Sequence, residues 1–131
     1  MDGVAAFIDG SAYAASVCDH AAWAAERLEE PLTLVHSLGK ADASSAPADL
    51  SGALRLGARR ALLEKLAAHD AERAALARER GRALLDDARA RVLATADVEA
   101  KTRLLRGDPV EALQEMERDA PPPRLLVIGK R

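Results

Sequence analysis

The chain has 131 residues, of which 49% are hydrophobic and 31% are charged, with a formal net charge of −2. This composition is typical of one soluble globular domain and excludes a disordered chain. The small negative charge predicts no binding to nucleic acid or to an anionic membrane, and no run approaches the ~18 apolar residues of a membrane span.

The first predicted elements are two buried strands with a helix between them. Val4 to Ile8 is a continuous apolar run that ends at Asp9-Gly10-Ser11, which is typical of a strand buried on both faces. A helix is predicted over roughly Ala12 to Glu29, where small and aliphatic residues recur at helical spacing, and Pro31 ends it. Leu32 to His36 is apolar and β-branched, which predicts the second strand.

The middle of the chain predicts a loop and a very long helical stretch. Residues 39–49 are rich in Ala, Ser, Asp and Pro, which indicates an exposed loop. From about Leu50 to Ala96 almost every residue favours a helix. One helix of ~40 residues would span ~60 Å, whereas strands of ~6 residues are only ~20 Å long. The stretch must therefore break, at Gly81 or at His69-Asp70, or protrude. We expect a protruding or hairpin-like element built on Leu56, Leu63 and Leu66.

The last third of the chain predicts a strand, a helix and a strand. Val98 to Leu105 alternates between apolar and charged residues, which indicates an edge strand. Gly107-Asp108-Pro109 then begins a helix that runs to about Arg118, with Asp108 at the N-cap and Glu111 at N3. Leu125 to Ile128 is apolar throughout and predicts a fourth strand. The βαβαβαβ order predicts a doubly wound, Rossmann-like α/β fold with a parallel sheet.

The position of the fourth predicted strand is unusual. It is as apolar as a central strand, yet the sequence ends three residues after Ile128. An unpaired strand of this kind would be a sticky edge. Either the sequence is a fragment that lacks its last helix and strand, or a second copy supplies the pairing. We favour the first and expect one domain over residues 1–131, incomplete at its C-terminus, with an enlarged helical region over about 50–96.

Four segments, in this order and spacing, resemble the universal stress protein family. They are Phe7-Ile8-Asp9-Gly10-Ser11, Leu32-Thr33-Leu34-Val35-His36, Leu105-Arg106-Gly107-Asp108-Pro109 and Leu126-Val127-Ile128-Gly129-Lys130-Arg131. The resemblance covers the chain apart from the helical stretch around Leu50 to Leu76. It implies a parallel sheet of order 3-2-1-4-5, of which the fifth strand is absent here. The expected order is therefore 3-2-1-4, which agrees with the alternation of the third strand.

The resemblance also implies a ligand. Members that bind ATP hold adenosine between strands one and four, and carry a glycine loop for the phosphates after strand four. Only the first of these glycines, Gly129, is present, and the others would lie beyond Arg131. The fifth strand is the usual dimerisation edge in the family, so its absence also affects the expected homodimer. A tandem partner domain is the other arrangement that we consider.

The residues themselves predict a site at the same place, because ligands of open α/β sheets bind beyond the carboxyl ends of the strands where the strand order reverses. Asp9 ends strand one and could accept hydrogen bonds from adenosine, or serve only as a turn residue or helix cap. Gly10 would let the backbone approach a ligand closely. Ser11, at a helix N-terminus, could either bind an anion or only cap the helix.

The other predicted site residues come from strands two and four. Val35 resembles the position whose backbone meets adenine, although its side chain belongs to the core. Ile128 ends strand four, Gly129 would begin the phosphate loop, and Lys130 lies near the same strand end. Asp108 and Pro109 are interpreted as helix-capping residues alone, because strand three is expected to lie far from the reversal point.

Three classes of function compete. The first is a stress-response regulatory protein that binds ATP or a related adenine nucleotide, with Mg²⁺ as a companion ion and slow hydrolysis at most. The second is an interaction and dimerisation module of the same fold that binds no nucleotide. The third, an enzyme of related topology, is not favoured because no nucleophile elbow or catalytic triad is visible, and the histidines and Cys18 lack metal-ligand spacing. The single cysteine excludes an internal disulfide, and the N-terminus lacks the basic region of a signal peptide, so we expect a cytoplasmic protein.

Overall fold

The computed structural model describes residues 3–39, 56–118 and 121–129, with side chains described from residue 62 onward in the long helix. The elements, in chain order, are β1 (Val4–Phe7), α1 (Ala14–Leu28), β2 (Leu32–Leu38), α3 (Leu56–Thr95), β3 (Ala100–Arg106), α4 (Pro109–Arg118) and β4 (Leu125–Val127). Most of the predicted loop over 39–49, the beginning of the predicted helical stretch at Leu50, and Lys130 and Arg131 lie outside the described residues.

The four strands form one parallel sheet of order β3-β2-β1-β4. Ala5 at the centre of β1 pairs with Thr33 of β2 on one side and with Leu126 of β4 on the other. The predicted α/β class, strand order and edge position of β3 are confirmed. The reversal of strand order therefore falls between β1 and β4, where the sequence places the candidate site.

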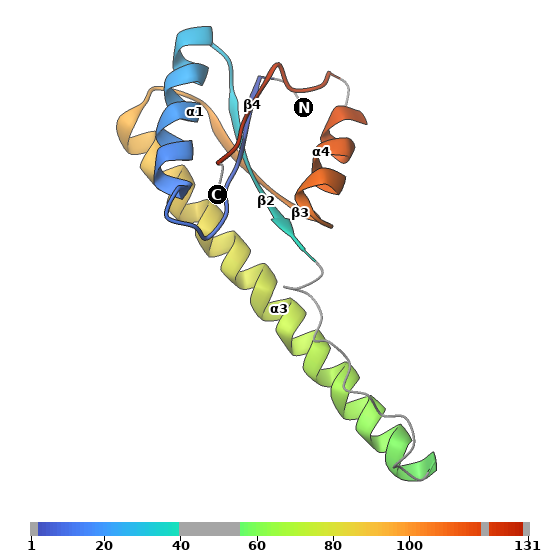
Figure 1. Cartoon of the computed structure of the whole chain (residues 1–131). Coiled ribbons are helices and arrows are strands. Elements are labelled where there is room, and N and C mark those ends of the chain that lie inside the picture. Colours follow the sequence, from blue (N-terminus) through green and yellow to red (C-terminus); the bar gives the residue numbers. More distant parts are fainter. Residues whose placement is uncertain (1–2, 40–55, 119–120, 130–131) are drawn as a thin grey trace.

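The sheet is covered unequally on its two faces. Figure 1 shows α1 and α3 on one face and α4 on the other. Alternate residues of the central strands point to opposite faces, so that Ala6 and Leu34 pack with α1 and α3, whereas Ala5 and Val35 pack with α4. The first face carries the larger buried cluster. On the second face the buried cluster consists of Ala5, Val35, Leu105, Ala112 and Met116.

Helix α3 is one continuous helix of 40 residues that extends past the sheet (Figure 1). The predicted break at Gly81 or at His69-Asp70 does not occur. Its buried residues, Gly81, Leu85, Ala88 and Val92, recur every three or four positions over its C-terminal part, which packs on β2, β3 and α1. Between residues 62 and 80 none of the described side chains is buried. The prediction of a protruding element is therefore correct. A helix ~60 Å long cannot pack along its whole length against strands of ~23 Å.

Helix α4 begins with the predicted capping box. The Glu111 backbone N–H donates to Asp108 Oδ1 at 2.9 Å, and the Asp108 N–H donates to Glu111 Oε2 at 3.3 Å. Gly107 has a φ of 93°, and a Cβ there would lie 2.1 Å from Glu111 Oε2. The glycine is therefore required both for the left-handed turn and for the return of the Glu111 carboxylate. This turn sets the direction in which α4 crosses back toward β4.

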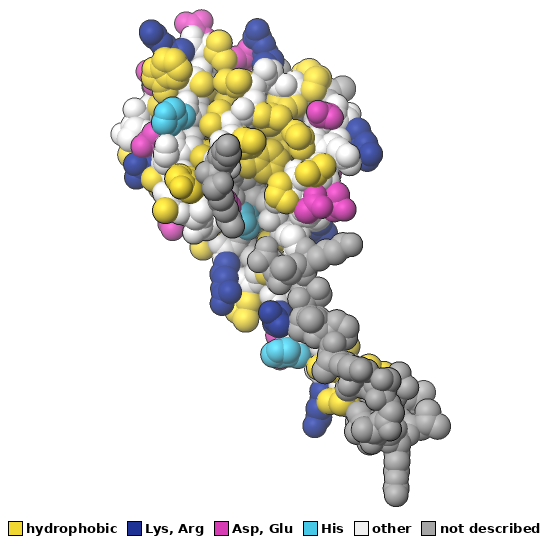
Figure 2. Space-filling view, in the orientation of Figure 1, with side chains coloured by type: hydrophobic (Ala, Val, Ile, Leu, Met, Phe, Trp, Pro, Cys, Tyr) yellow, Lys and Arg dark blue, Asp and Glu magenta, His cyan; other side chains and the backbone are white. Residues whose placement is uncertain are grey.

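Strand β4 differs from the sequence expectation. Its apolar sequence predicts a strand that is buried on both faces, but Leu125 is 39% exposed and Ile128, just after the strand, is 69% exposed. Figure 2 shows hydrophobic side chains gathered over β4 and between it and α4. Within the described residues β4 pairs only with β1, and α4 alone covers this face. The apolar character of β4 therefore leads to a partly open surface.

Candidate functional site

The structure brings Asp9 and Gly129 together at one end of the sheet. β1 and β4 are adjacent parallel strands, so both residues follow strand ends on the same edge. Both line an apolar cleft of 350 Å³, within the range of about 300–1,000 Å³ that is common for small-molecule sites. We call it the apolar cleft. Its lining residues are Phe7, Ile8, Asp9, His36, Ser37, Pro109, Val110, Leu113, Leu126, Ile128 and Gly129.

One wall of the apolar cleft comes from the first turns of α4, which the sequence analysis missed. Pro109, Val110 and Leu113 line it, and the Val110 side chain is 62% exposed. From its sequence Pro109 was interpreted as a capping residue alone, because β3 lies at the far edge of the sheet. The crossover from β3 to β4, however, places the beginning of α4 over the ends of β1 and β2. The apolar residues Val110 and Leu113 at the beginning of this helix were the sequence feature that could have predicted this wall.

Asp9 is held by a tight turn before α1. Its Oδ1 accepts hydrogen bonds from the Ser11 hydroxyl and from the Ser11 backbone N–H, the latter at 3.0 Å. The Ser11 hydroxyl oxygen in turn accepts the Tyr13 N–H at 3.3 Å. Helix α1 begins at Ala14 rather than at Ala12, so Ser11 precedes the first helical turn. The Ser11 hydroxyl therefore orients the Asp9 carboxylate, which lies at the edge of the cleft.

His36 of β2 lines the apolar cleft and is held in place from two sides. Its Nδ1 lies 2.7 Å from the Ile8 carbonyl oxygen. Because a carbonyl oxygen can only accept, His36 Nδ1 is the donor of this hydrogen bond. The other side of the ring packs against Gly81 of α3, where a Cβ would lie 2.9 Å from His36 Cδ2. The imidazole is therefore fixed between β1 and α3.

The remaining predicted residues lie around the cleft rather than inside it. Val35 is fully buried, and its carbonyl oxygen accepts the Ile8 N–H at 2.7 Å, so His36 and Ser37 line the cleft in its place. Ser11 does not line the apolar cleft. Gly10 faces open space, because a Cβ there would meet no protein atom within 4 Å.

A second cleft, of 680 Å³, adjoins the first. It lies between the strand ends and the side of α3, and we call it the rim cleft. Asp9 and His36 line both clefts, so the two meet at these side chains. The other lining residues of the rim cleft are Gly10, Leu38, Arg73, Leu76, Ala77, Arg80, Gly81 and Leu84.

Two ionisable side chains of α1, Cys18 and Asp19, take part in packing and in the contact with α3. Cys18 is buried in the main core, and burial raises the pKa of its thiol. Asp19 accepts two hydrogen bonds from Arg91, at 2.8 and 2.9 Å, which join α1 to α3 and lower the pKa of the carboxyl. Across the part of the chain that is described, no three His, Cys, Asp or Glu side chains gather into a metal-binding group. Nor does any described helix have the length and apolarity to cross a membrane.

Comparison with known proteins identifies the family. The profile of the "Universal stress protein family" matches residues 2–131. The chain belongs to the universal stress protein family. The resemblance of the four sequence segments is thereby confirmed. A search of curated protein sequences gave no match.

Several solved universal stress proteins share the fold. One from Burkholderia pseudomallei has 23% identity and a TM-score of 0.63, covering 98% of this chain and 80% of that protein. One from Lactobacillus plantarum has 22% identity and a TM-score of 0.58, covering 99% and 77%. A third, solved in complex with cAMP, has 18% identity and a TM-score of 0.58, covering 96% and 71%. At these identities the likeness shows the fold alone.

Proposed function

We propose that this universal stress protein is a stress-response regulatory protein that binds an adenine nucleotide, with adenosine in the apolar cleft. The observation that carries the proposal is the position of Asp9 at the edge of an apolar cleft. This cleft lies at the point where the strand order of the sheet reverses, between β1 and β4. An apolar slot accepts a purine ring, and an anchored carboxylate accepts hydrogen bonds from ribose hydroxyls. A structural relative in complex with cAMP makes this ligand class reasonable.

The residues of the cleft fit the nucleoside part of such a ligand. Phe7, Leu126 and Val110 supply apolar walls, and Ser37 adds a polar group at the edge. Gly10 and Gly129 leave the strand ends uncovered by side chains. We propose ATP or a related nucleotide as the ligand and Mg²⁺ as an ion that arrives with the phosphates. No chemical step is assigned to these residues beyond slow hydrolysis at most. A cytoplasmic location, where the thiol of Cys18 stays reduced, completes the proposal.

The proposal predicts that Val110→Glu weakens adenosine binding at least about tenfold, because a charged group must then lose water in an apolar cleft. The substitution is compatible with folding, since Val110 is 62% exposed and an acidic residue in the first turn suits the helix dipole. Gln114→Glu adds the same charge to an exposed position of α4 that does not line the cleft. Isothermal titration of adenosine into all three proteins is the measurement.

Equal affinities of the Val110→Glu variant and the wild-type protein would show that adenosine binds elsewhere. Absence of adenosine, AMP, cAMP and ATP binding by the wild-type protein would favour the second candidate function, an interaction module. One observation supports that candidate: β4 has a single strand neighbour among the described residues and carries exposed apolar side chains, including Leu125. Such an edge suits a homodimer or a tandem partner domain.

A further inference from the structure

The rim cleft carries a positive charge that the apolar cleft lacks. Arg73 and Arg80 line it from α3, and Asp9 is the sole acidic residue among its described lining. The two arginines are seven residues apart, which places them on the same side of the helix, ~10 Å from each other along its axis. Both are exposed at their side chains. The cleft therefore has one anionic end, at the strand, and a cationic side, on the helix.

Neither arginine is neutralised by the part of the protein that is described. Arg91 pairs with Asp19, Arg103 with Glu115 and Arg124 with Glu30. Within the described residues, no ion pair or hydrogen bond joins the guanidinium of Arg73 or Arg80 to another group. Two guanidinium groups with free donors on one side of a cleft suit a ligand with several anionic oxygens, because a guanidinium binds phosphate through paired N–H donors.

The junction of the two clefts indicates where the phosphate groups of a bound nucleotide would lie. Asp9 and His36 line both, so a molecule that leaves the apolar cleft past Asp9 enters the rim cleft next to α3. In a nucleotide the ribose joins an apolar base to anionic phosphates. The protein offers the matching groups in the same order: the apolar cleft for the base, Asp9 for the ribose and the two arginines for the phosphates. On the opposite side of Gly129, toward α1, a smaller hollow is lined by Tyr13, Ser16, Val17 and His20, and by no described lysine or arginine.

We propose that Arg73 and Arg80 of the protruding helix bind the phosphate groups of an adenine nucleotide in the rim cleft. The proposal rests on the proposed function for the base and ribose, and adds a phosphate site on α3. It also gives α3 a function, because Arg73 lies on the part of the helix whose described side chains are not buried. The ligand class is a nucleoside phosphate, with its charge on the α3 side of Asp9.

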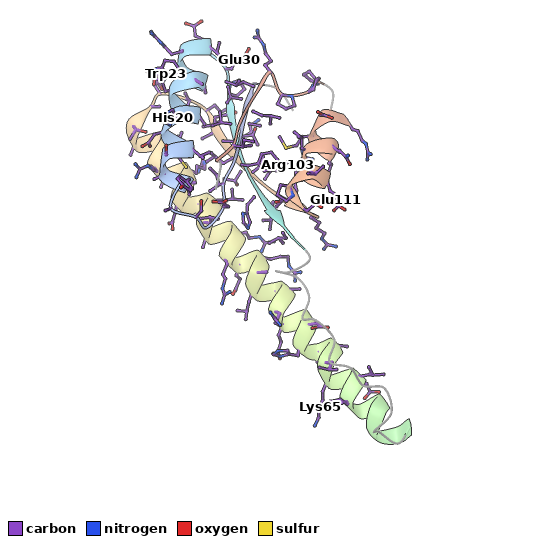
Figure 3. All side chains as sticks on the ribbon, viewed as in Figure 1. His20, Trp23, Glu30, Lys65, Arg103 and Glu111 are labelled. Atoms are coloured by element: carbon purple, nitrogen blue, oxygen red, sulfur yellow. The ribbon has the colours of Figure 1, made fainter. Side chains whose placement is uncertain are left out.

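The test compares four full-length proteins by isothermal titration. They are the wild type, Arg73→Gln/Arg80→Gln, the matched control Lys65→Gln/Arg82→Gln, and Lys130→Gln/Arg131→Gln. Lys65 and Arg82 are exposed on α3 and do not line the rim cleft, and Lys65 lies on the part of the helix far from the sheet (Figure 3). Each variant loses two positive charges, so non-specific attraction changes equally. The ligands are adenosine, ATP and inorganic tripolyphosphate, at low and at physiological salt.

We expect the Arg73→Gln/Arg80→Gln variant to bind ATP roughly tenfold more weakly, with unchanged adenosine affinity, because the variant loses two exposed ion pairs with the phosphates and each such pair contributes modestly in water. The difference should shrink as salt rises. If the arginine variant alone loses tripolyphosphate binding, the phosphate site is supported even when adenosine does not bind. This outcome distinguishes a failure of the proposed function from a failure of this inference. The inference is overturned if the arginine variant keeps the wild-type ATP affinity, if it weakens no more than the control, or if the Lys130→Gln/Arg131→Gln variant alone loses ATP.

Discussion

Replacing Leu34 with Ala is expected to lower the free energy of unfolding by about 2–5 kcal/mol, the range for a leucine truncated in a closed core. Leu34 is fully buried in the middle of β2, on the face that α1 and α3 cover. Both α1 and α3 cover this face, Asp19 of α1 pairs with Arg91 of α3, and Arg89 of α3 donates to the Ala100 carbonyl oxygen at 2.9 Å. We therefore expect the space left by the truncation to close only in part. Urea denaturation measures the loss.

The matched variant is Leu126→Ala on the other face. Leu126 is only partly buried and faces the thinner cluster under α4. Its truncation should cost about 1 kcal/mol or less, since little apolar surface leaves contact and solvent can fill the space. Equal losses for the two variants would contradict the unequal covering of the sheet. A far-UV spectrum of each variant confirms that the comparison is made between folded proteins.

Gly81→Val is expected to destabilise the protein by about 1–3 kcal/mol, as overpacking of a core contact does. A Cβ at Gly81 would lie 2.9 Å from His36 Cδ2 and 2.9 Å from Leu104 Cδ1. The His36 ring cannot move away freely, because Nδ1 is hydrogen-bonded to the Ile8 carbonyl oxygen. The helix would have to lift from the sheet. Thermal and urea unfolding provide the measurement.

Helix propensity makes the opposite prediction for the same substitution, which sharpens the test. Valine is a better helix former than glycine by a few tenths of a kcal/mol, so propensity alone would stabilise the variant. Ala83→Val, two residues away at an exposed position, carries a propensity loss of about 0.5 kcal/mol and no contact loss. If Gly81→Val is as stable as the wild type, the close approach of α3 to His36 and Leu104 is wrong.

The sequence allowed the fold to be predicted because its patterns are local. Apolar runs gave β1 and β2, alternation placed β3 at an edge, and the Asp108 capping box marked the beginning of α4. The boundaries moved by a few residues: β3 covers Ala100–Arg106 rather than Val98–Leu105, because β2 continues to Leu38 and pairs with it to the end. Strand pairing, and not the pattern of a single strand, decides where a strand ends.

The candidate site could be predicted only in part. Asp9, Ile128 and Gly129 lie together because each follows the end of β1 or β4, and the carboxyl ends of adjacent parallel strands lie at the same edge of the sheet. The contributions of α3 and α4 were not predicted, since they depend on how far each helix crosses the sheet. Arg73 lies 64 residues after Asp9 in the chain (73 − 9), and no local pattern joins them. Lys130, which the sequence analysis placed near the site, lies outside the described residues.

The central claim, that adenosine binds at the ends of β1 and β4, is tested most directly by nuclear magnetic resonance. ¹⁵N-labelled full-length protein is titrated with adenosine, and amide shifts are followed to saturation. We predict saturable changes at Ile8, Gly10 and Gly129, with the outer side of α1 at His20 and Trp23 unchanged (Figure 3). Saturable shifts confined to α1 or β3, or no saturable shift at these strand ends, would contradict the claim.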